Sequence, residues 1–155
     1  MKSNPGRDRS PALRRAGRVV CDLVTTGHVL ATFVAVEVSI RFVRLPRLAR
    51  TLGCRLELDA GESTFDTRPE LPGSAIRQLR CVRRVARRWP FGSGPCLRTA
   101  LVAGHLLRRL DPAIRLGSSG TGVDLSAHAW LEIDGRPLQP VDRYRTFGPA
   151  SVVAQ

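Results

Sequence analysis

Apolar residues in the first third of the chain recur with helical periodicity between arginines. The pattern runs from about residue 14 to residue 52 and contains Pro46. Because proline removes a backbone donor and disfavours helical geometry in the residue before it, we expect two helices here. Residues 1–12 mix Ser, Asn, Gly and Pro with charges without periodicity, which predicts a disordered tail.

Turn-forming residues dominate 53–73, so the pattern separates a helical N-terminal region with its loop (13–73) from a second region (74–155). Apolar positions then recur at helical spacing over 75–89, with six arginines between them. We interpret these arginines as a solvated face, with a partner-docking surface as the alternative. A further helix is predicted over 96–110, where an Asp-Pro pair ends it.

Beyond this point the periodicity changes from helical to alternating. Ile114 to Leu116 and Ser126 to Ile133 are predicted strands. The second of them ends at Asp134-Gly135, a strong signal for a hairpin turn, so residues 136–142 are expected to return antiparallel. Helices followed by antiparallel strands indicate an α+β fold.

The longest uncharged stretch, Leu23 to Val36, falls short of the roughly 20 apolar residues that a membrane-spanning helix needs. Spaced arginines follow it: Arg41, Arg44, Arg47 and Arg50. We interpret the stretch as a helix packed in the core with a solvated arginine face. Contact with a membrane surface, or docking to a partner, is the alternative.

A net charge of +12 would attract acidic peptides, partner proteins, RNA or anionic lipid. Of the 25 basic residues only Lys2 is a lysine, aromatic residues make up 5% of the chain, and no nucleic-acid-binding motif is present. We therefore expect no nucleic-acid partner.

Four cysteines are present: Cys21, Cys54, Cys81 and Cys96. None of them forms the closely spaced pair that a zinc site uses, so we expect no metal site. The basic N-terminus lacks the pattern of a secretory signal. We therefore expect a cytoplasmic protein with reduced thiols.

Cys96 occupies the predicted start of a helix. Ser93 or Gly94 can cap this helix, and Pro95 suits its first position. In the first turn, backbone N–H groups and the helix dipole favour the negative charge of a reactive thiolate. A buried structural thiol is the alternative, and we assign that role to the other cysteines.

His128 lies on a predicted strand, on the same face as Trp130 and Glu132. A strand histidine alone is more often structural, but together with a first-turn cysteine it forms the nucleophile and base of cysteine catalysis. Trp130 then either lines a substrate cleft or packs under a helix, whereas Glu132 is expected to be solvated.

An acid that orients the histidine has two candidates. Asp134 lies six residues further along the strand, about 20 Å away at roughly 3.3 Å per residue, and serves the turn. Asp142 would lie directly opposite His128 if the hairpin loop had three residues, and one position away if it had two. We therefore select Asp142.

A helix that opens with Cys96-Leu97 is followed by the Ala127 to Gly135 element, with its His-Ala-Trp triplet and hairpin. With these motifs, the segment from about Val85 to Asp142 resembles lasso-peptide maturation B proteins, which are transglutaminase-like proteases related to the microcin-processing protein. Arg98 and the Gly/Ser-rich segment 117–122 depart from the family pattern.

The resemblance implies a papain-like core, in which a cysteine at a helix N-terminus packs on an antiparallel sheet behind N-terminal helices. It also implies removal of the leader from a ribosomally made precursor, with Cys96, His128 and Asp142 as the catalytic residues. The expected partners are a small leader-recognition protein and an asparagine-synthetase-like macrolactam synthetase. No cofactor is expected on the chain itself, although the maturation complex is expected to use ATP.

Two alternatives to hydrolysis stay open at this stage. The same residues would support acyl transfer to an amine, as in transglutaminases, because an acyl-enzyme can be resolved by an amine as well as by water. The charge of +12 is also compatible with a non-enzymatic module that binds RNA or an acidic protein.

Overall fold

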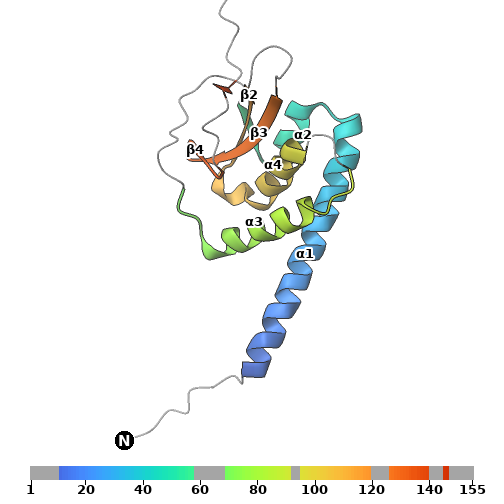
Figure 1. Cartoon of the computed structure of the whole chain (residues 1–155), viewed down its shortest axis with the longest axis vertical. Coiled ribbons are helices and arrows are strands. Elements are labelled where there is room, and N and C mark those ends of the chain that lie inside the picture. Colours follow the sequence, from blue (N-terminus) through green and yellow to red (C-terminus); the bar gives the residue numbers. More distant parts are fainter. Residues whose placement is uncertain (1–10, 58–68, 92–94, 120–125, 140–144, 147–155) are drawn as a thin grey trace, which may run out of the picture.

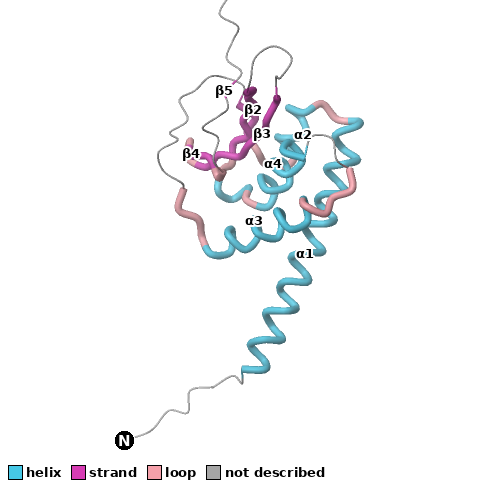
Figure 2. The backbone as a smooth tube through the Cα atoms, in the orientation of Figure 1, coloured by secondary structure: helices cyan, strands magenta, loops and turns pink. Residues whose placement is uncertain are grey.

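The computed structural model describes residues 11–57, 69–91, 95–119, 126–139 and 145–146. Its helices are α1 (Pro11–Phe42), α2 (Leu45–Thr51), α3 (Gly73–Ala86), α4 (Pro95–Leu106) and a 3-10 turn (Arg108–Leu110). Its strands are β1 (Arg55–Glu57), β2 (Ala113–Ser119), β3 (Ser126–Ile133), β4 (Arg136–Pro137) and β5 (Arg145–Thr146). The strands gather on one side of the molecule and the helices on the other (Figures 1 and 2), which confirms the mixed α+β class.

The predicted division of the N-terminal helical region is confirmed. α1 ends at Phe42, and Pro46 lies in the first turn of α2, where its missing N–H removes no helical hydrogen bond. α1 begins at Pro11, so its first turn includes the end of the segment that composition predicted to be a disordered tail. Residues 1–10 lie outside the described residues.

The sheet has five strands in the order β1-β2-β3-β4, with β5 also paired to β2. β2 and β3 are antiparallel, whereas β1 runs parallel to β2. The sheet is therefore mixed, and the purely antiparallel sheet that we expected is wrong. β1 and β5 have three and two residues, too few to show an alternating pattern in the sequence.

The hairpin between β3 and β4 has a two-residue loop. Ile133 pairs with Arg136, and both loop residues have positive φ, 52° at Asp134 and 69° at Gly135. This is the type I′ geometry that an Asp-Gly pair favours. The predicted turn is confirmed, and the three-residue loop that would have placed Asp142 opposite His128 is wrong.

One hydrophobic core joins the helices to the sheet. α1 contributes Val29 and Phe33, α4 contributes Leu101 and Val102, and β3 contributes Leu131. The loop around residue 73 therefore separates two stretches of sequence but does not divide the core.

An ion pair links α4 to α1 beside this core. The Arg98 guanidinium donates to Glu37 at 2.5 Å, and Arg41 contacts the same carboxylate at 3.4 Å. The hydrogen bond from Arg98 lowers the pKa of Glu37 and outweighs the opposing effect of burial. Glu37 is therefore ionised, and the pair fixes the first turns of α4 relative to α1.

Alternate residues of β3 face opposite sides of the sheet, as predicted. Ala129, Leu131 and Ile133 belong to the hydrophobic core. On the other face Glu132 is only 1% exposed, so the expectation that it is solvated is wrong. It accepts hydrogen bonds from Arg115 Nε and from Trp130 Nε1, both at 2.8 Å. These donors offset the loss of water around the buried carboxylate.

α1 is apolar on two opposite faces. At 100° per residue, its buried side chains Val29, Phe33 and Val36 lie on the side away from a stripe of exposed apolar residues. The stripe consists of Val20, Leu23, Val24, Leu30, Val34, Val38 and Phe42. The helix packs in the core as expected, and Arg41 near its end is exposed, but most of its outer face is apolar. The other expected arginines, Arg44, Arg47 and Arg50, are exposed in and next to α2. Its N-terminal half extends away from the body (Figure 1).

Within α1 the segment Val20–Phe42 has 23 residues and a mean hydropathy of 1.6. By length and composition alone this segment is sufficient to cross a membrane. The uncharged stretch 23–36, from which we expected no membrane span, is shorter and not long enough by itself. Core helices of soluble proteins meet the same criterion, and 28% of its most apolar window is buried against the rest of the structure.

We predict that Glu132→Leu lowers the free energy of unfolding by about 3–5 kcal/mol, because two buried donors lose an acceptor. Glu132→Gln keeps an acceptor for Trp130 and should lose less. Urea denaturation followed by tryptophan fluorescence measures both variants. A loss below about 1 kcal/mol for Glu132→Leu, with an unchanged m value, would contradict a structural role for this network.

Gly104 allows α4 to pack closely on Cys54. A Cβ at position 104 would overlap Cys54 Sγ and lie 3.2 Å from Leu131 Cδ1. We predict that Gly104→Ala destabilises the fold by about 1–3 kcal/mol, despite the higher helix propensity of alanine. Adding Cys54→Ala removes the overlapping sulfur, so the double variant should be more stable than Gly104→Ala alone. Additive losses in thermal unfolding would count against this contact.

Candidate active site

Cys96 is the second residue of α4 and lies in its first turn, as the sequence predicted. The side chain of Thr99 donates a hydrogen bond to the Pro95 carbonyl at 2.6 Å, within the same turn. Cys96 is partly buried and packs against the edge of the core. The predicted cap residues, Ser93 and Gly94, lie outside the described residues.

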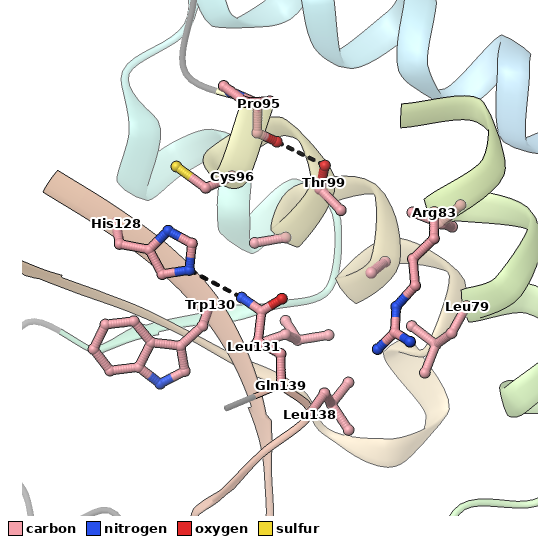
Figure 3. A pocket seen from close by; sticks show the side chains of 13 residues that line it. Leu79, Arg83, Pro95, Cys96, Thr99, His128, Trp130, Leu131, Leu138 and Gln139 are labelled. Carbon is pink, nitrogen blue, oxygen red and sulfur yellow. Dashed lines mark hydrogen bonds between the residues drawn. The ribbon is translucent and has the colours of Figure 1, made fainter. Parts of the chain in front are cut away.

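His128 lies on β3, opposite Gly117 of β2. Cys96 and His128 line the same cavity, which has a volume of about 280 Å³. Figure 3 shows both side chains at one end of this cavity, with Nδ1 of the imidazole on the side of the ring nearer to Cys96. The remaining wall is mainly aliphatic: Leu79, Val82, Ala100, Ala103, Leu131 and Leu138. The structure thus brings together the two residues selected from the sequence.

Burial lowers the pKa of His128 below its ordinary value of 6.5. Partial removal of water disfavours the charged imidazolium, so the ring is neutral at neutral pH. A neutral imidazole has one nitrogen with a lone pair, which is the form that accepts a proton from a thiol.

Gln139 is a site residue that the sequence interpretation missed. Its Nε2 lies 3.1 Å from Nε2 of His128, and its side chain also lines the cavity (Figure 3). The two-residue hairpin loop explains its position, since Leu138 N–H donates to the Leu131 carbonyl and the next residue then lies beside Trp130 and His128. Counting residues from the Asp134-Gly135 turn could have identified this position.

Of the two acids considered from the sequence, only Asp134 is among the residues that the structure describes, and it does not lie beside His128. Asp134 occupies the hairpin turn, six residues along β3, and is exposed. Asp142 lies outside the described residues. Among the described residues, the carboxamide of Gln139 contacts the imidazole.

Trp130 supports the imidazole from the same strand. The two rings are nearly parallel, with centroids 6.4 Å apart and an interplanar angle of 19°. Trp130 is fully buried, and its indole N–H donates to Glu132, which in turn binds Arg115. Trp130 also lines the cavity that contains Cys96 and His128. Its side chain is therefore both packed in the interior and part of the cavity wall. A rigid side chain therefore stands beside His128.

The other cysteines stand in different surroundings. Cys54 is buried, which raises the pKa of its thiol to about 11 and keeps it protonated. Cys81 is buried, with Sγ 3.4 Å from the Thr26 hydroxyl, and Cys21 is exposed on α1. None of these three lines the cavity that contains His128.

Comparison with known families agrees with this arrangement. The family model described as "Transglutaminase-like superfamily" matches residues 35–152, which include Cys96, His128 and Gln139. No curated protein and no solved structure matches the chain significantly. The matched segment begins within α1. Because the match covers more than half of the chain, this protein belongs to the transglutaminase-like superfamily.

Proposed function

We propose that this protein is a cysteine peptidase that removes the leader from a lasso-peptide precursor. The observation that carries the proposal is the convergence of Cys96, from a helix N-terminus, and His128, from a strand, on one cavity. Members of the superfamily are commonly cysteine-dependent hydrolases or acyltransferases. The resemblance of the segment from Val85 to Asp142 to the lasso-peptide B proteins supports the more specific role.

In the proposed reaction His128 takes the thiol proton of Cys96, and the sulfur attacks the scissile carbonyl carbon. The tetrahedral intermediate collapses, the C–N bond breaks, and the imidazolium returns the proton to the departing amine. Water then attacks the thioester with His128 as base, which releases the carboxylate and regenerates the thiol. The first backbone N–H groups of α4 are suited to stabilise negative charge that develops beside Cys96.

Gln139 is proposed to orient the imidazole. In one orientation its NH₂ group donates to a bare Nε2, and after a half turn its oxygen accepts from Nε2–H. The second orientation leaves Nδ1 as the basic nitrogen, on the side of the ring nearer to Cys96. In this orientation the amide oxygen can also accept the Nε2–H hydrogen bond of the imidazolium. In this proposal the Gln139 carboxamide helps to position the imidazole, and Asp142 stays the predicted acid of the catalytic residues.

The wider setting of the reaction is also a proposal. The resemblance supports a precursor leader as substrate, delivered by a small leader-recognition protein in the cytoplasm. A macrolactam synthetase related to asparagine synthetase would then close the ring of the released core peptide. ATP would be consumed by that assembly, and no step at Cys96 requires it.

We predict that the wild-type protein, with a candidate precursor, its recognition partner and ATP, releases free leader, and that Cys96→Ala and His128→Ala do not. Each substitution removes a group that the covalent step needs, so the rate should fall by at least about 10³-fold. Mass spectrometry of the products measures this. Cys54→Ala is a matched control, because that cysteine lies outside the cavity, and the folded variant should retain full activity.

The same assay distinguishes hydrolysis from acyl transfer. A leader that ends in a free carboxylate without added amine supports the peptidase, whereas a product that forms only with an amine donor indicates a transferase. Cleavage that survives Cys96→Ala would show that the nucleophile has been assigned wrongly.

The pH profile tests the roles of His128 and Gln139. Because burial lowers the pKa of His128, the decline of kcat/KM on the acid side should have its midpoint below pH 6.5, as the imidazole gains a proton. Gln139→Glu places a carboxylate beside the ring, raises the pKa of His128 and moves this decline to higher pH. Gln139→Met removes the hydrogen bond and should lower kcat by up to about 10²-fold with little change in melting temperature.

An acid limb that does not move in Gln139→Glu would show that this side chain does not contact the working base. A loss of activity in Gln139→Met that follows a loss of folded protein would assign Gln139 a structural role. Circular dichroism of each variant separates these outcomes.

A further inference from the structure

The most concentrated charge in the described structure lies on α3 and the two residues that follow it. Six arginines occur there within 12 positions, and α3 contains no acidic residue. They are Arg77, Arg80, Arg83, Arg84, Arg87 and Arg88. All six are exposed, and helical geometry continues through Arg87. At 100° per residue they fall within an arc of about 140°, which we call the arginine face.

The arginine face is not balanced by acids in the described part of the chain. Arg98, Arg55 and Arg115 all pair with glutamates elsewhere in the structure. None of the six side chains of the arginine face forms an ion pair with a described residue. Like charges three and four positions apart repel one another on a helix, so this arrangement works against the stability of α3.

Arg83 connects the arginine face to the candidate active site. It lines the cavity that contains Cys96 and His128, and Figure 3 shows its guanidinium turned toward that cavity, across from Gln139. A peptide held at Cys96 therefore lies within reach of at least one cation of this face. The arginine face is therefore continuous with the cavity that contains Cys96 and His128.

The other flank of the arginine face borders a second hollow, of about 370 Å³, between α1 and α3. Arg77, Arg80 and Arg84 line it together with hydroxyl and amide groups from both helices, and Asp22 contributes a single carboxylate. Three guanidinium groups against one carboxylate leave this hollow cationic. An extended chain that leaves the cavity across Arg83 can continue over the arginine face to this hollow.

We infer that the arginine face binds an acidic segment of the same peptide whose scissile bond lies at Cys96. This inference rests on the proposed peptidase function and specifies its substrate as a peptide with several Asp or Glu residues beside the cleavage site. Arginine pairs with carboxylates in a forked geometry, and exposed charges of this kind guide association and select the partner. A peptide is favoured over RNA, because α3 presents no exposed aromatic residue for bases to stack on.

The binding test uses a fluorescein-labelled glutamate-rich dodecamer, with a lysine-rich and a Gly/Ser dodecamer as comparisons. The arginine-face variant carries Arg80→Glu, Arg83→Glu and Arg84→Glu. Its matched control carries Arg44→Glu, Arg47→Glu and Arg50→Glu, which make the same change in net charge at exposed positions in and next to α2. Circular dichroism confirms that both variants are folded.

Fluorescence anisotropy at about 0.1 M salt should show that the wild-type protein binds the acidic dodecamer. The affinity should fall about tenfold or more in the arginine-face variant and about twofold in the control. Equal losses in the two variants would overturn the inference, because only net charge would then matter. Absence of binding to the wild-type protein would also overturn it, as would an oligouridylate that displaces the acidic peptide from the same face.

A cleavage test separates this inference from the proposed function. Matched precursor peptides carry Glu or Lys in the segment that flanks the scissile bond, and Arg83→Glu is compared with wild type. We expect the wild-type kcat/KM to favour the Glu peptide and Arg83→Glu to reverse that preference. Cleavage of both peptides without any preference would refute the inference and leave the peptidase intact, whereas acidic binding without cleavage would refute the peptidase alone.

Discussion

The packing of α4 on β3 is the constraint on which the candidate active site depends. Cys96 and His128 are 32 positions apart in the chain, and they share a cavity because α4 lies directly against the strand that carries the histidine. Gly104 permits this close approach, since any side chain there would overlap Cys54 and crowd Leu131. The hydrogen-bonded pair of Arg98 and Glu37 fixes the other side of α4 to α1. The proposed nucleophile is thus positioned by a helix that is held from two directions.

The face of β3 that carries Trp130 and Glu132 contains a buried polar network. Glu132 is buried and binds both Arg115 and Trp130, and Trp130 stands beside the imidazole of His128. A buried carboxylate is tolerated here because each of these donors offsets part of its lost hydration. The result is a rigid, partly dehydrated environment for a neutral histidine, which suits a general base at neutral pH.

The surface is divided between features of different chemistry. The outer face of α1 is apolar, with Phe42 82% exposed, whereas the exposed side of α3 is cationic and carries no acid. The two helices pack against each other, so the apolar stripe and the arginine face belong to one rigid half of the molecule (Figure 1). Neither feature stabilises the isolated fold, which is why both bear on binding more than on folding.

Local chemistry determined much of this protein from the sequence alone. The break near Pro46, the Asp134-Gly135 turn and the two-sided strand around His128 each depend on neighbouring residues and stand where the pattern placed them. The helix predicted over 96–110 begins one residue earlier, at Pro95, and ends at Leu106, before a 3-10 turn. The sequence also selected the two proposed catalytic residues, because a thiol at a helix start and an imidazole on a strand are the pair that cysteine catalysis uses.

Only the tertiary structure decided what depends on pairing between distant segments. The parallel strand β1 is too short to leave a periodic signal, and its partner β2 follows more than 50 positions later. Glu132 and Gln139 read as ordinary solvated residues until the sheet and the hairpin register place them beside Arg115 and His128. Burial and hydrogen-bond partners are properties of packing, and alternation along a strand defines the two faces without showing what covers either of them.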